Sequence, residues 1–154
     1  SIKNTKSMID LNYTSVLNII ILLQEYFDVL SIKQVAVVSS VAAWRGLPMA
    51  AAYCSSKAAL KSAIESIELD YSNTNVKFRL FYPGFVETPL TDKNDFKMPF
   101  IIKVNVAGEK IYKSIKQSNK FEISFPLRFT VLMKLISMLP WPLYKWLMLK
   151  KIKK

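Results

Sequence analysis

The sequence predicts an α/β protein built around a parallel sheet. Three short apolar or alternating runs, typical of strands, lie at residues 35–39, 75–82 and 120–124. Helical patterns at 51–73 and 104–117 separate them. Strands that alternate with helices of this length imply right-handed crossovers and parallel pairing. A chain of 154 residues suits one domain with a buried core.

The first element in chain order is a helix over about residues 5–30. Its centre, residues 16–23, is an almost unbroken apolar run. Such a run predicts a core helix that is buried nearly all round. The run is too short to span a bilayer, and polar residues flank it.

The middle of the chain supplies two strands and the helix between them. The β-branched run at 35–39 is typical of a strand buried on both faces. Gly46 and Pro48 break the loop that follows, and 51–73 is rich in Ala, Lys and Glu. The alternating strand at 75–82 ends at a Pro-Gly pair, and a loop then leads to the helix at 104–117.

The end of the chain has a different composition. The net charge is +11, yet every acidic residue lies at or before Glu122, and seven basic residues follow it. Residues 127–139 and 142–152 could form two short amphipathic helices, separated by a Pro-Trp-Pro sequence. Bases interleaved with Leu, Met, Phe and Trp suit an anionic membrane surface better than nucleic acid, so we expect no nucleic-acid partner. A membrane anchor, a lid over a hydrophobic pocket, and an extension packed on the body or on a dimer partner stay open.

Composition excludes several kinds of site. The chain has no histidine and a single cysteine, Cys54. Histidine-based triads are therefore excluded, and we expect no metal site and no disulfide framework. No signal-peptide pattern follows Ser1, and a beginning without Met suggests a processed chain or a fragment. We expect a reducing, cytoplasmic location, with the membrane periphery as the alternative.

Three side chains have the chemistry of a proton-transfer group. Tyr53 and Lys57 are four residues apart on a predicted helix, so they share one face. A phenol with a pKa of about 10 is a poor acid–base catalyst at neutral pH, and a nearby ammonium lowers that pKa. Ser40 ends the preceding strand, at the edge of the sheet where open α/β proteins build their sites.

The order of these residues closely resembles the short-chain dehydrogenase/reductase family. The serine lies 13 residues before the tyrosine, and a loop with Gly and Pro and a small-residue helix start lie between them. The resemblance implies that Tyr53 passes the proton and Ser40 orients and polarises the substrate oxygen. It also implies that Lys57 lowers the tyrosine pKa and contacts the ribose hydroxyls of a nicotinamide cofactor.

Two further features extend the resemblance. Asn12, 28 residues ahead of Ser40, matches a family asparagine that helps to hold a water in a proton relay. The sequence YPGFVETPL matches the loop that contacts the nicotinamide carboxamide in the family. By this resemblance the residues that bind the cofactor are Tyr53, Lys57, Pro83, Gly84, Val86 and Thr88.

The dinucleotide fingerprint of the family has no counterpart in this sequence. It needs clustered glycines, whereas Gly46, Gly84 and Gly108 are far apart. The chain therefore resembles the C-terminal half of a Rossmann-type doubly wound parallel sheet, with a partial domain at 1–124 and a basic, hydrophobic helical tail at 125–154. We expect it to be inactive alone and the strand at 35–39 to expose an apolar edge. The choice between NAD and NADP is not readable.

The function implied for the full-length protein is the reversible interconversion of an alcohol and a carbonyl by hydride transfer. We expect a small, lipophilic substrate that contacts 41–49 and 85–100, where the aromatic residues are Trp44, Phe85, Phe96 and Phe100. A homo-oligomer and peripheral membrane contact through 125–154 complete the expected partners. The alternative is a non-catalytic interaction or membrane-associated module.

Overall fold

The computed structural model describes residues 2–89, 91–93 and 98–152. Its centre is a sheet of three parallel strands in the order β1 (Gln34–Val38), β2 (Lys77–Pro83) and β3 (Glu122–Phe125). Gln34 lies opposite Lys77, and Leu80 lies opposite Glu122. The predicted parallel α/β class is confirmed, and the strands begin and end within a few residues of the predicted positions.

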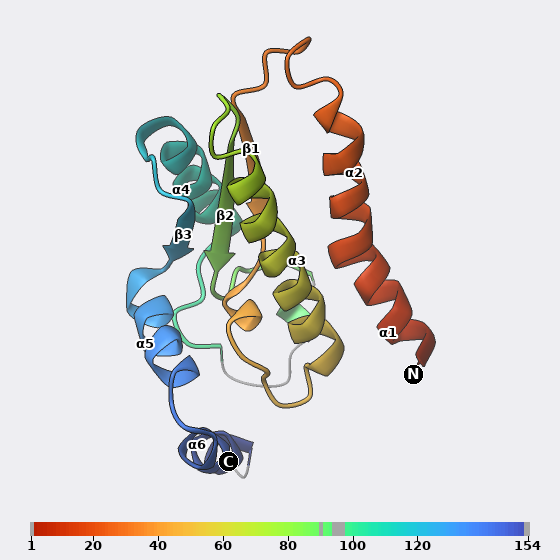
Figure 1. Ribbon diagram of the computed structural model, residues 1–154. Coiled ribbons are helices and arrows are strands. Elements are labelled where there is room, and N and C mark those ends of the chain that lie inside the picture. The colour runs from red at the N-terminus through yellow and green to blue at the C-terminus, as the bar shows by residue number, and fades with distance from the viewer. Residues whose placement is uncertain (1, 90, 94–97, 153–154) are drawn as a thin grey trace.

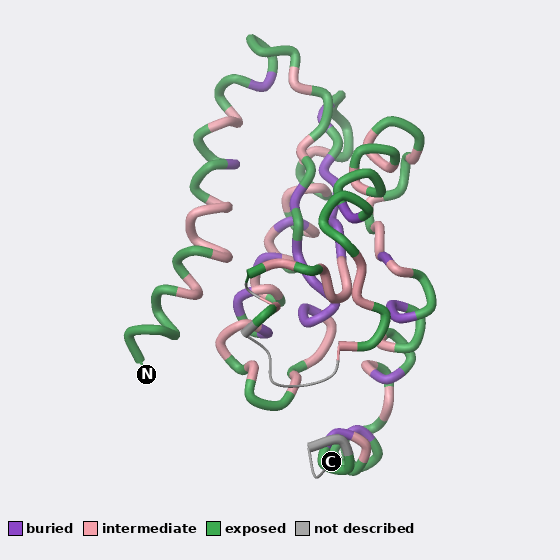
Figure 2. Tube along the Cα trace, turned by 180° about the vertical axis from the view of Figure 1, so that it is seen from behind, coloured by how far each residue is buried: buried purple, intermediate pink, exposed green. Residues whose placement is uncertain are grey.

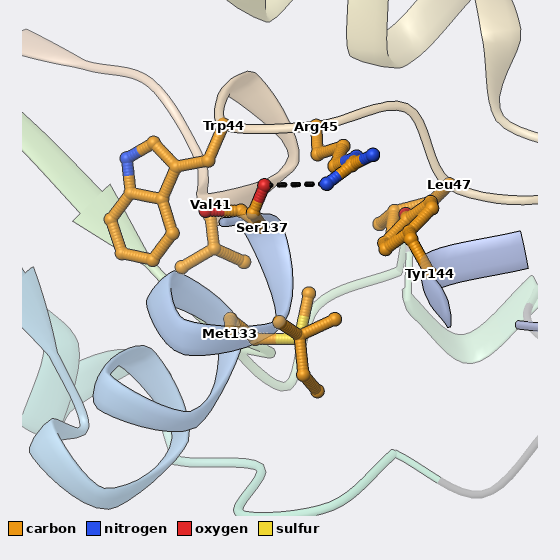
Figure 3. Close-up of a pocket in the computed structure, with 8 residues that line it drawn as sticks. Val41, Trp44, Arg45, Leu47, Met133, Ser137 and Tyr144 are labelled. Carbon is orange, nitrogen blue, oxygen red and sulfur yellow. Dashed lines mark hydrogen bonds between the residues drawn. The ribbon is translucent and has the colours of Figure 1, made fainter. Parts of the chain in front are cut away.

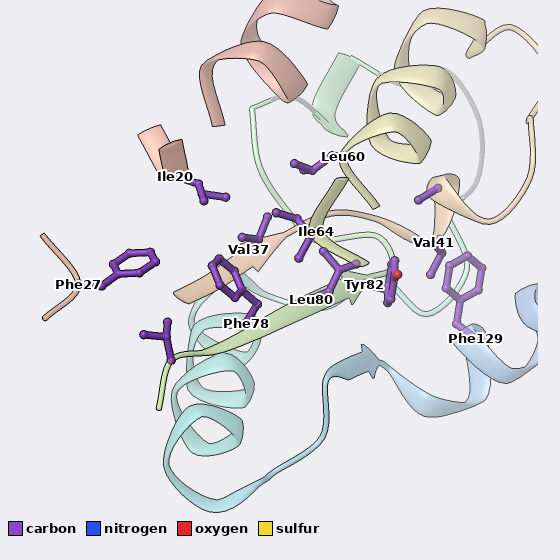
Figure 4. Close-up of a cluster of buried hydrophobic side chains, with 12 residues drawn as sticks. Ile20, Phe27, Val37, Val41, Leu60, Ile64, Phe78, Leu80, Tyr82 and Phe129 are labelled. Carbon is purple, nitrogen blue, oxygen red and sulfur yellow. The ribbon is translucent and has the colours of Figure 1, made fainter. Parts of the chain in front are cut away.

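Helices cover both faces of the sheet, as the alternation of β2 side chains requires (Figure 1). Phe78, Leu80 and Tyr82 point into a core shared with α3 (Ala51–Asp70) (Figure 4). Phe81 points to the other face and packs in a second cluster with α4 (Val104–Gln117). Each of these side chains is at most 1% exposed, so its burial contributes about 1.5–3 kcal/mol.

A buried arginine fixes the end of α4. Arg79, on the α4 face of β2, donates hydrogen bonds from Nη1 to the carbonyl oxygens of Ser114 and Ser118. These carbonyls belong to the C-terminal turn of the helix and its cap, where a cation also opposes the negative end of the helix dipole. The predicted helix at 104–117 coincides with α4.

The N-terminal helix differs from the prediction in its ends and its burial. It runs as α1 (Ile2–Ile9), a π-helical turn (Asp10–Thr14) and α2 (Ser15–Gln24), and turns occupy 25–31. Within α2 only Ile20 is buried, while Ile19, Ile21 and Leu22 are exposed, so the expectation of burial nearly all round was wrong. The reason is that no described element covers the outer side of this helix (Figure 2).

The same helix bears on the expectation about membrane spans. The continuous segment Ile2–Gln24 is long and apolar enough to cross a membrane, and 6% of its most apolar window is buried. The apolar run at 16–23 is short by itself, but the helix that contains it is not. Core helices of water-soluble proteins pass the same test of length and composition, but they are mostly buried.

Strand β1 also departs from its predicted burial. Of its five residues only Val37 is buried, whereas Val38 is exposed. In the described sheet β1 pairs with β2 alone and is therefore an edge strand, as the sequence led us to expect for this chain. Two-sided burial needs an element packed on each face, and among the described residues only the face of Val35 and Val37 lies against the core.

Two helices follow β3 at the end of the chain. They are α5 (Leu127–Ser137) and α6 (Trp141–Ile152), close to the predicted ranges. Phe129 of α5 belongs to the main core cluster (Figure 4). The strand arrows in Figure 1 point toward the end of the molecule where α5 and α6 lie. The carboxyl ends of the strands are thus on the same side as the tail.

Candidate active site

Ser40 lies just past the carboxyl end of β1 and caps a short helical turn. Its backbone is extended, and its Oγ accepts a hydrogen bond of 3.2 Å from the amide of Ala42 in the 3-10 helix Val41–Ala43. Serine is favoured at such a cap because its oxygen replaces a missing backbone acceptor. The side chain is buried and fixed at the edge of the sheet.

Tyr53 lies in the first turns of α3 and comes within hydrogen-bonding reach of Ser40. Burial raises the pKa of the Tyr53 phenol, and the hydrogen bond with Ser40 opposes this shift and lowers the pKa. The phenol is therefore protonated at neutral pH. A protonated phenol and a serine hydroxyl side by side form a pair of donors that can hold one substrate oxygen.

Lys57 lies one turn further along α3, on the face that it shares with Tyr53. Its Nζ donates a hydrogen bond of 3.3 Å to the carbonyl oxygen of Val38 at the end of β1. Burial lowers the pKa of the lysine. The structure thus brings the three predicted residues to the carboxyl end of β1, with the ammonium directed to the strand rather than to the phenol oxygen.

Asn12 occupies the π-helical turn between α1 and α2 and contacts α3. Its Nδ2 donates a hydrogen bond of 3.2 Å to Oγ of Ser56, which itself donates one of 2.8 Å to the carbonyl oxygen of Tyr53. Turns of this kind often occur at functional sites. Ser56 is fully buried and was missed by sequence reasoning, although its position between Tyr53 and Lys57 was the available signal.

The loop after β2 is stabilised by a threonine that the sequence did not indicate. Thr91 Oγ1 donates a hydrogen bond of 2.8 Å to the carbonyl oxygen of Val86 and accepts one of 2.9 Å from the amide of Thr88. The hydroxyls of Thr88 and Thr91 are 3.3 Å apart. Val86 also pairs with Ile102 in an isolated parallel bridge. Both predicted loop residues are therefore held in place by their neighbours.

The Pro83–Gly84 turn closes against the tail. The amide of Gly84 donates a hydrogen bond of 2.8 Å to the carbonyl oxygen of Phe125. A Cβ atom on Gly84 would lie 2.5 Å from Cδ1 of Phe129, so glycine is the residue that lets this ring approach the backbone. The space over Gly84 is filled by α5.

The aromatic residues expected at the substrate side lie in two places. The rings of Phe85 and Phe100 pack 5.4 and 6.3 Å from the ring of Phe129. The ring of Trp44 lies 5.2 Å from that of Tyr82. Phe96 lies outside the described residues. Helix α5 thus joins the two loops that the resemblance assigns to the substrate.

Arg45 fastens the tail to the loop that follows Ser40 (Figure 3). Its Nη1 donates a hydrogen bond of 2.7 Å to the carbonyl oxygen of Ser137 and a second to that of Leu139, at the end of α5. Its guanidinium lies 4.1 Å from the ring centre of Tyr144, whose hydroxyl donates to the carbonyl oxygen of Gly46. No pattern in the sequence indicates this contact, because the partners are 92 to 98 residues apart.

The donor set fits one end of a nicotinamide dinucleotide. A lysine ammonium, a phenol and a threonine hydroxyl are groups that bind ribose hydroxyls and a carboxamide. A pyrophosphate needs clustered backbone amides at a helix N-terminus, and the three glycines of this sequence lie in three separate segments. The described residues of this chain therefore fit the nicotinamide end of the cofactor, and among them no cradle for its phosphates is found.

Comparison with known sequences agrees with this arrangement. The family described as short chain dehydrogenase matches residues 1–98. An uncharacterized oxidoreductase of Myxococcus xanthus is 41% identical over 107 residues, which cover 70% of this chain and 42% of that protein. A 3beta-hydroxysteroid dehydrogenase of Mediterraneibacter gnavus is 39% identical over 57 residues, or 37% of this chain and 21% of that protein. The chain belongs to the short-chain dehydrogenase family, as the sequence predicted.

Solved structures show the same fold. A short chain dehydrogenase from Burkholderia cenocepacia in complex with NADP superposes with a TM-score of 0.82 at 18% identity, over 96% of this chain and 60% of that one. A 4-hydroxyisoleucine dehydrogenase with NADH and succinate superposes with a TM-score of 0.65 at 19% identity, over 80% and 57%. The chain thus spans about half the length of the proteins that it matches, and the predicted Rossmann-type fold is confirmed.

Proposed function

We propose that the protein to which this chain belongs is an NAD(P)-dependent oxidoreductase that interconverts an alcohol and a carbonyl. The observation that carries this proposal is the placement of three groups at the carboxyl edge of the sheet: Ser40 caps the turn after β1, Lys57 donates to the carbonyl oxygen of Val38, and Tyr53 lies near Ser40 on the helix face of Lys57. Family membership supports the reaction class.

The roles of the residues follow from their environment. Burial keeps the Tyr53 phenol protonated, so it can give its proton to a carbonyl oxygen as that oxygen gains negative charge. Ser40, held at its cap, positions the same oxygen and stabilises the developing charge. In the direction of alcohol oxidation, Tyr53 must first be deprotonated so that its phenolate can accept the proton of the alcohol. A Lys57 ammonium favours the phenolate once the lysine side chain turns from Val38 toward the phenol.

The nicotinamide, when bound, supplies or accepts the hydride. We assign its nicotinamide and ribose end to Tyr53, Lys57 and the loop 83–88, with NAD and NADP both open. Relatives of the same fold in complex with NADP and with NADH support this assignment. Since the chain offers no cradle for the pyrophosphate, we propose that it is inactive alone and acts within a longer protein.

The substrate and setting are proposed on the same basis. The aromatic residues Trp44, Phe85 and Phe100 beside the two substrate-side loops favour a lipophilic alcohol or carbonyl compound. A partial match to a protein named as a 3beta-hydroxysteroid dehydrogenase agrees with that class. We also propose a homo-oligomer in the cytoplasm. The alternative function, a membrane-associated module, is favoured by the exposed apolar surface of the tail.

The test is Tyr53→Phe in the full-length protein, with Tyr112→Phe on the exposed side of α4 as the matched control. We expect Tyr53→Phe to lower turnover by about 10²–10⁴-fold, because the proton donor is lost. Binding of the reduced cofactor, followed by its fluorescence, should stay within about twofold, since a phenyl ring keeps the packing of the site. Turnover retained in Tyr53→Phe would remove this residue from its role and overturn the mechanism.

A further inference from the structure

Helix α5 is apolar on two opposite faces. One face packs on the body through Phe129, Met133 and Ile136. The opposite face carries an apolar stripe of four residues that recur at helical spacing. They are Leu127, Val131, Leu135 and Met138, which are 70, 49, 61 and 74% exposed, respectively. A surface helix normally places polar residues there. The stripe therefore calls for an apolar partner.

Helix α6 continues this surface with a different composition. Tyr144 and Met148 face inward and are buried. The exposed residues of the helix combine aromatic, aliphatic and basic types, namely Trp141, Leu143, Lys145, Trp146, Leu149 and Lys150. The Nζ atom of Lys150 lies 5.2 Å from the ring centre of Trp146. Tryptophan and lysine together are typical of the boundary between lipid and water.

Charge and position limit what can cover this surface. Residues 123–154 carry seven basic residues and no acidic one, so a second copy of the same face would bring like charges together. A nucleic acid would leave the apolar stripe of α5 without a partner. By the family resemblance, the dinucleotide-binding half would add its strands beside β1, across the sheet from β3, which α5 contacts (Figure 1).

We propose that the outer face of α5 and α6 docks on an anionic lipid bilayer. The apolar stripe and the two tryptophans enter the interfacial region, while Lys145 and Lys150 remain at the level of the charged headgroups. This surface is separate from the Ser40–Tyr53 site. Docking therefore goes beyond the proposed reaction and does not depend on it.

The contacts of Arg45 link this surface to the site. Because Arg45 and Tyr144 tie α5 and α6 to residues 45–46, a docked tail holds the loop that follows Ser40 at the bilayer surface. If the proposed function is correct, a substrate dissolved in the membrane would reach that loop without crossing bulk water. This consequence rests on the proposed reaction, whereas docking itself does not.

Vesicle binding tests the proposal directly. The full-length protein is sedimented with vesicles of phosphatidylcholine, with and without phosphatidylserine, and its tryptophan emission is recorded, because the isolated chain also exposes apolar residues of α2 and β1. We expect binding and a blue shift with the anionic vesicles, and loss of both in high salt. Leu135→Glu should weaken binding by about tenfold or more, because it places a charge in the apolar stripe. Leu69→Glu, at a leucine of α3 that is 74% exposed against 61% for Leu135, is the matched control and should bind like the parent.

A second variant covers the case in which Leu135→Glu does not fold. Lys145→Glu with Lys150→Glu alters only exposed side chains and should also reduce binding to anionic vesicles. Tyr53→Phe should bind like the parent, which separates docking from catalysis. No binding to anionic vesicles, equal binding to neutral ones, or binding unchanged by both tail variants would overturn the proposal. So would a dimer in sedimentation velocity that Leu135→Glu dissolves.

Discussion

Replacing Gly84 with alanine tests the packing of the tail on the cofactor-side loop. The added Cβ would lie 2.5 Å from Cδ1 and 3.0 Å from Cε1 of Phe129, and 3.3 Å from Cδ of Pro126. Phe129 is buried, so its ring cannot simply move into solvent. Overpacking of this kind costs about 1–3 kcal/mol, and the lower entropy of the unfolded chain returns about 0.4–1 kcal/mol. Because 2.5 Å is far inside van der Waals contact, the cost here falls in the upper part of that range, about 2–3 kcal/mol, and we expect a net loss of roughly 1–2.6 kcal/mol, which lowers the melting temperature by about 2–10 °C.

Gly108→Ala is the matched control for this substitution. Nothing lies within 4 Å of a Cβ at Gly108, which is in the middle of α4. An alanine there should stabilise the chain by about 0.5–1 kcal/mol, so the same chemical change has opposite signs at the two glycines. Urea denaturation followed by circular dichroism measures both. Gly84→Ala that is as stable as the parent would refute the placement of Phe129, and Phe129→Leu should reduce the cost of the alanine.

Two further predictions concern a buried tyrosine and the arginine that holds the tail. Burial and a hydrogen bond of 2.8 Å to Glu122 raise the pKa of Tyr82, so its contribution to stability is present below about pH 10 and lost as the pH rises further. Tyr82→Phe should therefore cost about 1 kcal/mol at pH 7 and progressively less above pH ~10 in urea titrations, and an unchanged difference would contradict this. Arg45→Met should weaken the attachment of the tail by about 1.5–3 kcal/mol, seen as faster hydrogen exchange in 138–148. Arg128→Met, at an exposed arginine of α5, is the control. Equal hydrogen-exchange rates of 138–148 in the two variants would contradict the attachment of the tail by Arg45.

Much of the fold could be predicted because its signals are local. The helix at 104–117 and the strand ends near Pro83 are set by periodicity and by breakers, which act within a few residues. The pairing of Tyr53 with Lys57 followed from helix geometry, and the position of Ser40 followed from the end of a strand. These three residues do meet at one edge of the sheet.

The errors concern burial, which depends on neighbours. The sequence led us to expect residues 16–23 and 35–39 to be surrounded, because apolar runs are usually covered. In the structure the outer sides of α2 and β1 face no described element. An apolar run indicates that its side chains should be buried, but it does not identify the segment that buries them.

The sequence by itself predicted the order of elements, the family and the grouping of Ser40, Tyr53 and Lys57, because each of these depends on residues that lie close together in the chain. Only the tertiary structure decided how Asn12 is held by Ser56, and how Arg45 fixes the end of α5. Such contacts join residues that are 44 and 92 positions apart. Folding brings them together through packing of whole helices on the sheet, and no local pattern in the chain encodes that meeting.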